Sequence, residues 1–112
     1  MAERRILVTG AASGIGAAAC RLLAAPGVAI AVHTRRNREG AERTAAAVRE
    51  RGGTAHLLPL ADLAEAEAPA RLVAEAVAAL GGAGLDVLVS NAGFADRTPV
   101  AALTDEGFAR SH

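Results

Sequence analysis

The stretch Thr9-Gly10-Ala11-Ala12-Ser13-Gly14-Ile15-Gly16 decides the expected fold, because it joins an apolar run to a helical pattern. The run before it, Ile6-Leu7-Val8, is short and ends at a glycine, which predicts a strand over residues 4–9. Apolar residues after it recur at helical spacing up to a stop at Pro26-Gly27, which predicts a helix over residues 14–25. The stretch is therefore a strand-to-helix turn.

The three glycines of this turn suggest a phosphate site. Gly10 suits the turn out of the strand, Gly14 leaves the backbone open to a close ligand, and Gly16 allows close helix packing. The free amide groups and the dipole of a helix N-terminus attract anions. Taken alone the pattern is only a tight turn with glycines. Its place between a strand and a helix favours a dinucleotide site.

The rest of the chain repeats the alternation of strand and helix. We expect strands over 28–34, 54–61 and 85–90, and helices over 38–51 and 69–80. Asn37 is suited to cap the second helix, and Pro69 suits the first turn of the third. Thr104 is suited to begin a fourth helix, inside which the chain stops. Strands of continuous apolar character, joined by helices, predict a doubly wound α/β fold with a parallel sheet in the order 3-2-1-4.

Composition excludes several classes of protein. The chain has 112 residues, of which 52% are hydrophobic, so it can build one small core. Its 12 basic and 12 acidic residues give no charge excess, so we expect neither nucleic acid nor membrane as a partner. No apolar run reaches the roughly 18 residues of a membrane span, and no signal peptide is evident, so we expect a cytoplasmic protein. We expect no metal site, because the histidines are scattered and Cys20 is the single cysteine, best suited to packing.

The glycine spacing is Gly-x-x-x-Gly-x-Gly, and two further motifs follow it in order. Asp62-Leu63 comes after the third expected strand and Asn91-Ala92-Gly93 after the fourth. With these motifs the chain resembles the N-terminal portion of the short-chain dehydrogenase/reductase family, from Arg4 to its last residues. We expect residues 1–112 to be the dinucleotide-binding part of one incomplete Rossmann-type domain, truncated in its fourth helix.

The resemblance implies roles for particular residues. Those that match the pyrophosphate loop are Gly10, Ser13, Ile15 and Gly16, with Gly14 beside them. The pair Asp62-Leu63 matches the adenine contact, and Asn91-Ala92-Gly93 matches the stretch that shapes the cofactor pocket. Thr9 would tie the ends of the first and fourth strands through its hydroxyl. The simpler alternatives are a helix N-cap for Asp62 and a turn residue for Asn91.

The end of the second expected strand predicts which nucleotide binds. An NAD site usually has an acidic residue there, whereas this chain has His33-Thr34-Arg35-Arg36-Asn37-Arg38. A guanidinium binds a 2′-phosphate that a carboxylate would repel. We therefore expect NADP(H) in preference to NAD(H), with Arg35 as the main contact and Arg36 or Asn37 secondary. The alternative is that these are solvated loop arginines.

Catalysis in this family uses Asn, Ser, Tyr and Lys, and none of the four catalytic residues is present here. The chain has no Tyr, and all 12 of its basic residues are Arg. We expect a longer, homo-oligomeric protein to carry out hydride transfer on a small carbonyl or alcohol substrate, and this chain alone to be inactive. The alternative is a non-catalytic nucleotide-binding or interaction module that stands alone.

Overall fold

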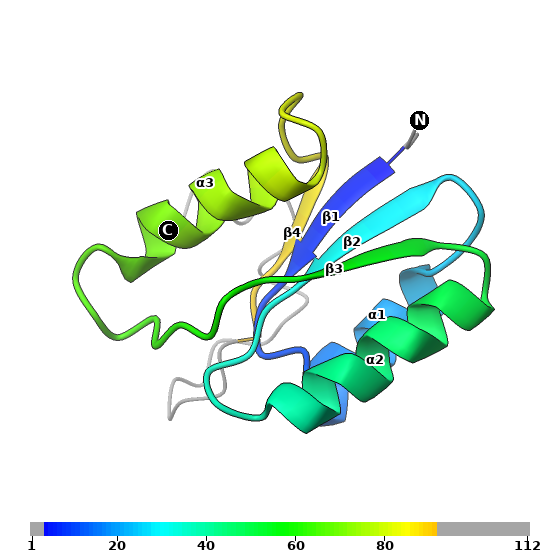
Figure 1. The fold of residues 1–112 in the computed structure, drawn as a ribbon, viewed down its shortest axis with the longest axis horizontal. Coiled ribbons are helices and arrows are strands. Elements are labelled where there is room, and N and C mark those ends of the chain that lie inside the picture. Colours follow the sequence, from blue (N-terminus) through cyan, green and yellow to red (C-terminus); the bar gives the residue numbers. More distant parts are fainter. Residues whose placement is uncertain (1–3, 92–112) are drawn as a thin grey trace.

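The computed structural model describes residues 4–91. Strands and helices alternate along this part of the chain (Figure 1). The strands are β1 (Arg4–Val8), β2 (Val28–Val32), β3 (Thr54–Leu57) and β4 (Val87–Val89). The helices are α1 (Gly14–Leu23), α2 (Arg38–Glu50) and α3 (Ala68–Ala79). The expected fourth helix lies outside the described residues.

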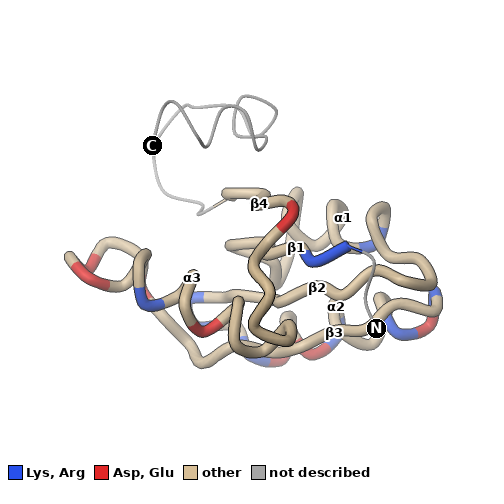
Figure 2. The backbone as a smooth tube through the Cα atoms, turned by 90° about the horizontal axis from the view of Figure 1, so that it is seen from above, with Lys and Arg blue, Asp and Glu red and all other residues tan. Residues whose placement is uncertain are grey.

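The four strands form one parallel sheet in the order β3-β2-β1-β4, which confirms the predicted topology. Figure 2 shows this order from above, with β4 at one edge and β3 at the other. In the centre of the sheet, Ile6 is aligned with Ile30 on β2 and with Val87 on β4. The carboxyl ends of all four strands therefore lie at the same end of the sheet, together with the loops that follow them.

Helices cover both faces of the sheet, α1 and α2 on one and α3 on the other (Figure 1). Because side chains alternate along a strand, β1 supplies both layers. Ile6 and Val8 pack with Val48 of α2 and Cys20 of α1, whereas Leu7 packs with Leu72 of α3. The buried apolar runs predicted from the sequence thus build two cores on one sheet.

Within residues 4–91, the predicted elements are right in type and order but too long at several ends. The third strand ends at Leu57, not at residue 61. Pro59 explains the difference, because proline lacks the N–H that a sheet ladder needs. Among the described residues, no helix is long and apolar enough to cross a membrane.

Candidate functional site

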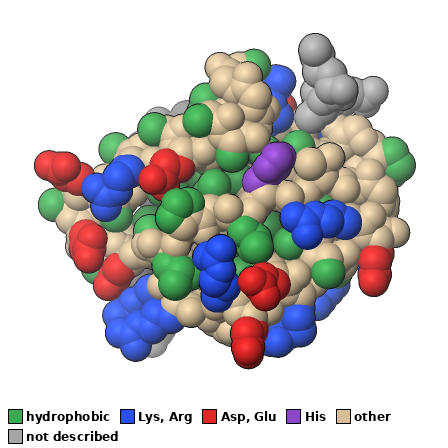
Figure 3. All heavy atoms as spheres, viewed as in Figure 1, with side chains coloured by type: hydrophobic (Ala, Val, Ile, Leu, Met, Phe, Trp, Pro, Cys, Tyr) green, Lys and Arg blue, Asp and Glu red, His purple; other side chains and the backbone are tan. Residues whose placement is uncertain are grey.

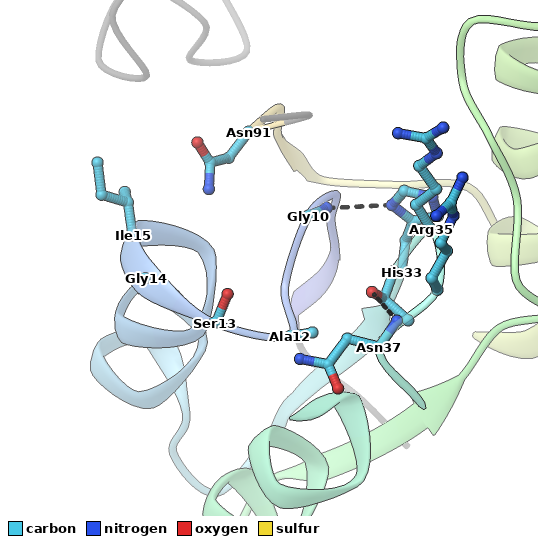
Figure 4. A pocket seen from close by; sticks show the side chains of 11 residues that line it. Gly10, Ala12, Ser13, Gly14, Ile15, His33, Arg35, Asn37 and Asn91 are labelled. Carbon is cyan, nitrogen blue, oxygen red and sulfur yellow. Dashed lines mark hydrogen bonds between the residues drawn. The ribbon is translucent and has the colours of Figure 1, made fainter. Parts of the chain in front are cut away.

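A cavity of about 390 Å³ opens at the carboxyl ends of β1, β2 and β4. Its walls come from the glycine turn, from the segment after β2 and from Asn91 after β4 (Figure 4). The lining residues are Gly10, Ala12, Ser13, Gly14, Ile15, His33, Thr34, Arg35, Arg36, Asn37 and Asn91. In open α/β sheets, ligands bind beyond the carboxyl ends of the strands, as this cavity is placed.

The glycine turn depends on glycine at three positions for different reasons. Gly10 and Gly14 both have φ of 61°, a left-handed conformation that side chains disfavour. A Cβ on Gly16 would lie 2.1 Å from the carbonyl oxygen of Gly10, whereas a Cβ on Gly14 would meet nothing within 4 Å. Gly16 is therefore required for packing of α1 on its own turn, and Gly14 keeps the cavity open.

The N-terminus of α1 keeps its hydrogen-bonding groups for a ligand. Ser13 is the N-cap residue, but its side chain makes no capping hydrogen bond. The amides of the first helical turn have no intrahelical acceptors, and Ser13, Gly14 and Ile15 line the cavity. This arrangement can bind an anion such as a pyrophosphate.

The backbone of the turn is held from β2 and α2. The amide of Ala11 donates to the carbonyl oxygen of His33 at 2.8 Å. The hydroxyl of Thr44 lies 2.8 Å from the carbonyl oxygen of Ala11, and Thr44 is buried. A Cβ on Gly40 would lie 2.5 Å from the carbonyl oxygen of Ala12, so α2 packs closely against the turn. The backbone of the turn is therefore hydrogen-bonded and packed on the side away from the cavity.

His33 is the main residue of the site that the sequence interpretation missed. It is 2% exposed, and its Nδ1 lies 3.1 Å from the backbone nitrogen of Gly10. Its Nε2 lies 2.9 Å from the carbonyl oxygen of Ala61. Burial lowers the pKa of His33 below its ordinary value of 6.5, against a smaller opposing effect of the Ala61 hydrogen bond. No local pattern marks this role, because both partners are distant backbone groups.

Arg35 lies on the rim of the cavity, where its Nε is 3.4 Å from a carboxylate oxygen of Asp62. The side chains are 58% and 37% exposed, so this ion pair is weak and the guanidinium remains accessible. The other oxygen of Asp62 accepts a hydrogen bond from the amide of Ala64. The interpretation of Asp62 as a helix N-cap is wrong, because α3 is preceded by Glu67.

The other residues predicted for the site come from the ends of β1 and β4 and from the segment after β3. Asn91 lines the cavity, and its amide donates to the hydroxyl of Thr9 at 2.7 Å, so Thr9 does tie the first and fourth strand ends. Leu63 is half-buried against the core on the α3 side. Ala92 and Gly93 lie outside the described residues.

A second cavity in the described part of the chain is a weaker candidate, because neither an arginine nor a helix N-terminus is among its lining residues. This cavity of about 440 Å³ lies at the opposite ends of β2 and β3, and Ala29, His56 and Leu80 are among its lining residues. Acidic and basic side chains are interspersed over the face that Figure 3 shows.

Burial raises the pKa of the Cys20 thiol to about 12, which suits a packing residue. Within residues 4–91, no group of three metal-ligating side chains occurs.

Comparison with known proteins gives consistent matches. The family model for short chain dehydrogenase matches residues 4–111. A cis-4-hydroxycyclohexanecarboxylate dehydrogenase of Sinomonas cyclohexanicum is 46% identical over 95 residues, which are 85% of this chain and 36% of that protein. The chain thus spans about a third of the length of this curated relative.

Solved structures show the same fold with either nucleotide. A short chain dehydrogenase from Burkholderia cenocepacia J2315 in complex with NADP has a TM-score of 0.74 and 35% identity, over 95% of this chain and 42% of that one. An NAD⁺-bound xylitol dehydrogenase has a TM-score of 0.73 and 36% identity, over 97% of this chain and 41% of that one. The relatives therefore include binders of both nucleotides.

Proposed function

The chain belongs to the short-chain dehydrogenase family, and we propose that it forms the nucleotide-binding part of an NADP(H)-dependent oxidoreductase. The complete protein would act on a small alcohol or carbonyl compound. The observation that carries the nucleotide assignment is Arg35 on the cavity rim, in a segment with no acidic residue before Glu39.

The residues that line the cavity suit a dinucleotide. The first turn of α1 would receive the pyrophosphate, with the Ser13 hydroxyl as a further donor. Asp62, beside Arg35, would lie on the adenine side. The guanidinium of Arg35 would turn from this exposed carboxylate to a 2′-phosphate, because a dianion binds it more strongly than a solvated carboxylate does.

Binding and orientation are the contributions of this part of the chain. Nicotinamide nucleotides supply hydride transfer when bound. A reaction that needs a tyrosine acid/base and a lysine cannot be carried by these 112 residues, which contain neither. We therefore propose that the chain alone binds the nucleotide but does not turn over substrate. NADPH oxidation with a panel of aldehydes and ketones, above a protein-free control, would overturn this statement.

Calorimetric titration of NADP⁺ and NAD⁺ tests the nucleotide preference. We expect NADP⁺ to bind about ten- to a hundredfold more tightly, the effect of one charge-assisted hydrogen-bonded pair. Arg35→Ala should remove most of this preference and leave NAD⁺ affinity nearly unchanged. Arg51→Ala is the matched control, because Arg51 is an exposed arginine beyond the end of α2. Equal losses for both nucleotides would contradict the role of Arg35.

A stand-alone binding module remains the second candidate function. Residues 4–91 contribute both the helix N-terminus and the arginine that line the cavity. NADP⁺ binding by a monodisperse, cooperatively unfolding monomer would favour the module. Aggregation, or pairing through the outer edge of β4, would favour a part of a larger oxidoreductase, since an apolar edge strand needs a partner.

A further inference from the structure

His33 occupies a central place in the floor of the cavity. It follows β2 directly, and its backbone amide donates to the carbonyl oxygen of Val8 while its carbonyl oxygen accepts from Ala11. The side chain adds the bonds to Gly10 and Ala61. Three segments that are distant in sequence, the glycine turn, the end of β2 and the segment after β3, thus meet at one residue.

The partners define the tautomer of the imidazole. The carbonyl oxygen of Ala61 can only accept, so Nε2 carries the proton and donates to it. The amide of Gly10 can only donate, so Nδ1 is the unprotonated acceptor. Both ring nitrogens are committed to the protein, and neither is left to bind a ligand.

The two bonded segments serve two neighbouring parts of the proposed nucleotide site, the pyrophosphate and the adenosine with its 2′-phosphate. Gly10 begins the turn that presents the N-terminus of α1. Ala61 directly precedes Asp62, which lies in contact with Arg35. A shift of either segment would change the distance between the pyrophosphate donors and the 2′-phosphate ligand.

We propose that His33 is a positioning residue that sets the glycine turn and the Ala61–Asp62 segment at the spacing a dinucleotide requires. This proposal rests on the proposed function of the cavity. His33 does not touch the reacting groups, and it acts through two backbone contacts, as a neutral imidazole. An apolar ring of similar shape would fill the space and leave the Gly10 amide and the Ala61 carbonyl without partners.

Two variants separate positioning from packing. His33→Phe keeps the ring and removes both hydrogen bonds, and we expect NADP⁺ affinity to fall about tenfold or more. His33→Asn places an amide oxygen near the position of Nδ1, where it can accept from Gly10. We expect this variant to recover most of the lost affinity, although it is smaller and packs less well than Phe. If His33 served only for packing, the Phe variant would bind NADP⁺ more tightly than the Asn variant.

Controls make the outcome decisive. Val48→Ala removes buried volume from α2 away from the cavity, so it should lower the thermal midpoint and leave NADP⁺ affinity unchanged. Should the Phe variant not fold, His33→Gln replaces it, since its amide N–H can reach Ala61 but its oxygen does not replace Nδ1. Equal affinity of all His33 variants and the natural chain would overturn the positioning role. A folded natural chain that binds no NADP⁺ would instead overturn the proposed function.

Discussion

The N-termini of α1 and α2 line the same cavity, but they satisfy their backbone groups in opposite ways. At α2, the side-chain oxygen of Asn37 accepts from the amide of Gly40 at 2.9 Å. At α1, the side chain of Ser13 makes no such bond. One terminus is closed by its own cap, and the other keeps its amides for a ligand.

The difference shows how one fold divides stability and binding between two similar helix ends. A helix end that serves as an anion site gives up the stabilisation that a cap provides, which is about 1 kcal/mol. At α1 this loss is offset by contacts behind the turn, from His33, Thr44 and Gly16. Mutations of the two N-cap residues should therefore have different signatures, with Asn37 affecting unfolding and Ser13 affecting nucleotide binding.

Gly16→Ala should have the largest effect. Its Cβ would overlap the carbonyl oxygen of Gly10, which cannot move without breaking the turn. We expect the free energy of unfolding to fall by about 3 kcal/mol, measured by urea denaturation. Gly14→Ala is the control, because its Cβ enters open space and costs only the left-handed strain of about 1–2 kcal/mol. Equal destabilisation by the two would contradict the close packing of α1 on its turn.

Ser13→Ala should come next, and it should change binding without changing stability. Because its hydroxyl caps nothing, its removal leaves the unfolding transition where it is. A lost hydrogen bond to a charged phosphate should reduce NADP⁺ and NAD⁺ affinity alike, about tenfold. Titration of both nucleotides against the variant measures this. A lower thermal midpoint with intact affinity would show that Ser13 acts as a structural cap.

Asn37→Ala should give the opposite result and a smaller effect. It removes the acceptor of the Gly40 amide, and we expect a loss of about 1 kcal/mol in the free energy of unfolding. Nucleotide affinity should change little, because the side-chain oxygen of Asn37 is engaged by Gly40 and Arg35 is the main expected contact of the 2′-phosphate. Asn37→Asp is the matched variant, because a carboxylate also caps a helix. If Asn37→Ala weakened nucleotide binding more than Ser13→Ala did, the division between the two helix ends would be wrong.

Much of this arrangement follows from local sequence signals. The alternation of apolar runs with helical patterns predicts the elements, and Asn37 predicts the cap that α2 has. The early end of β3 was also readable from Pro59. The role of His33 was not, because its partners lie 23 and 28 residues away and are backbone groups of any residue type. Long-range contacts to backbone leave no residue pattern to recognise.

The last and most local effect concerns acidity, which should loosen the turn before α1 and not the cap of α2. The His33 pKa is lowered in the folded chain, so the unfolded chain takes up a proton first as the pH falls. The contribution of neutral His33 to stability is therefore complete above its ordinary pKa of 6.5 and decreases as the pH falls below that value. A proton on Nδ1 would face the amide of Gly10, whereas Asn37 does not titrate.

Hydrogen exchange of the Gly10 and Gly40 amides, corrected for intrinsic rates, is the measurement that tests this effect of acid. We expect protection at Gly10 to fall on acidification relative to Gly40, and this difference to vanish in His33→Asn, which retains an acceptor but no titrating ring. Parallel loss of protection at both amides would mean that acid unfolds the chain as a whole. His33 would then not stabilise the glycine turn separately from the rest of the fold.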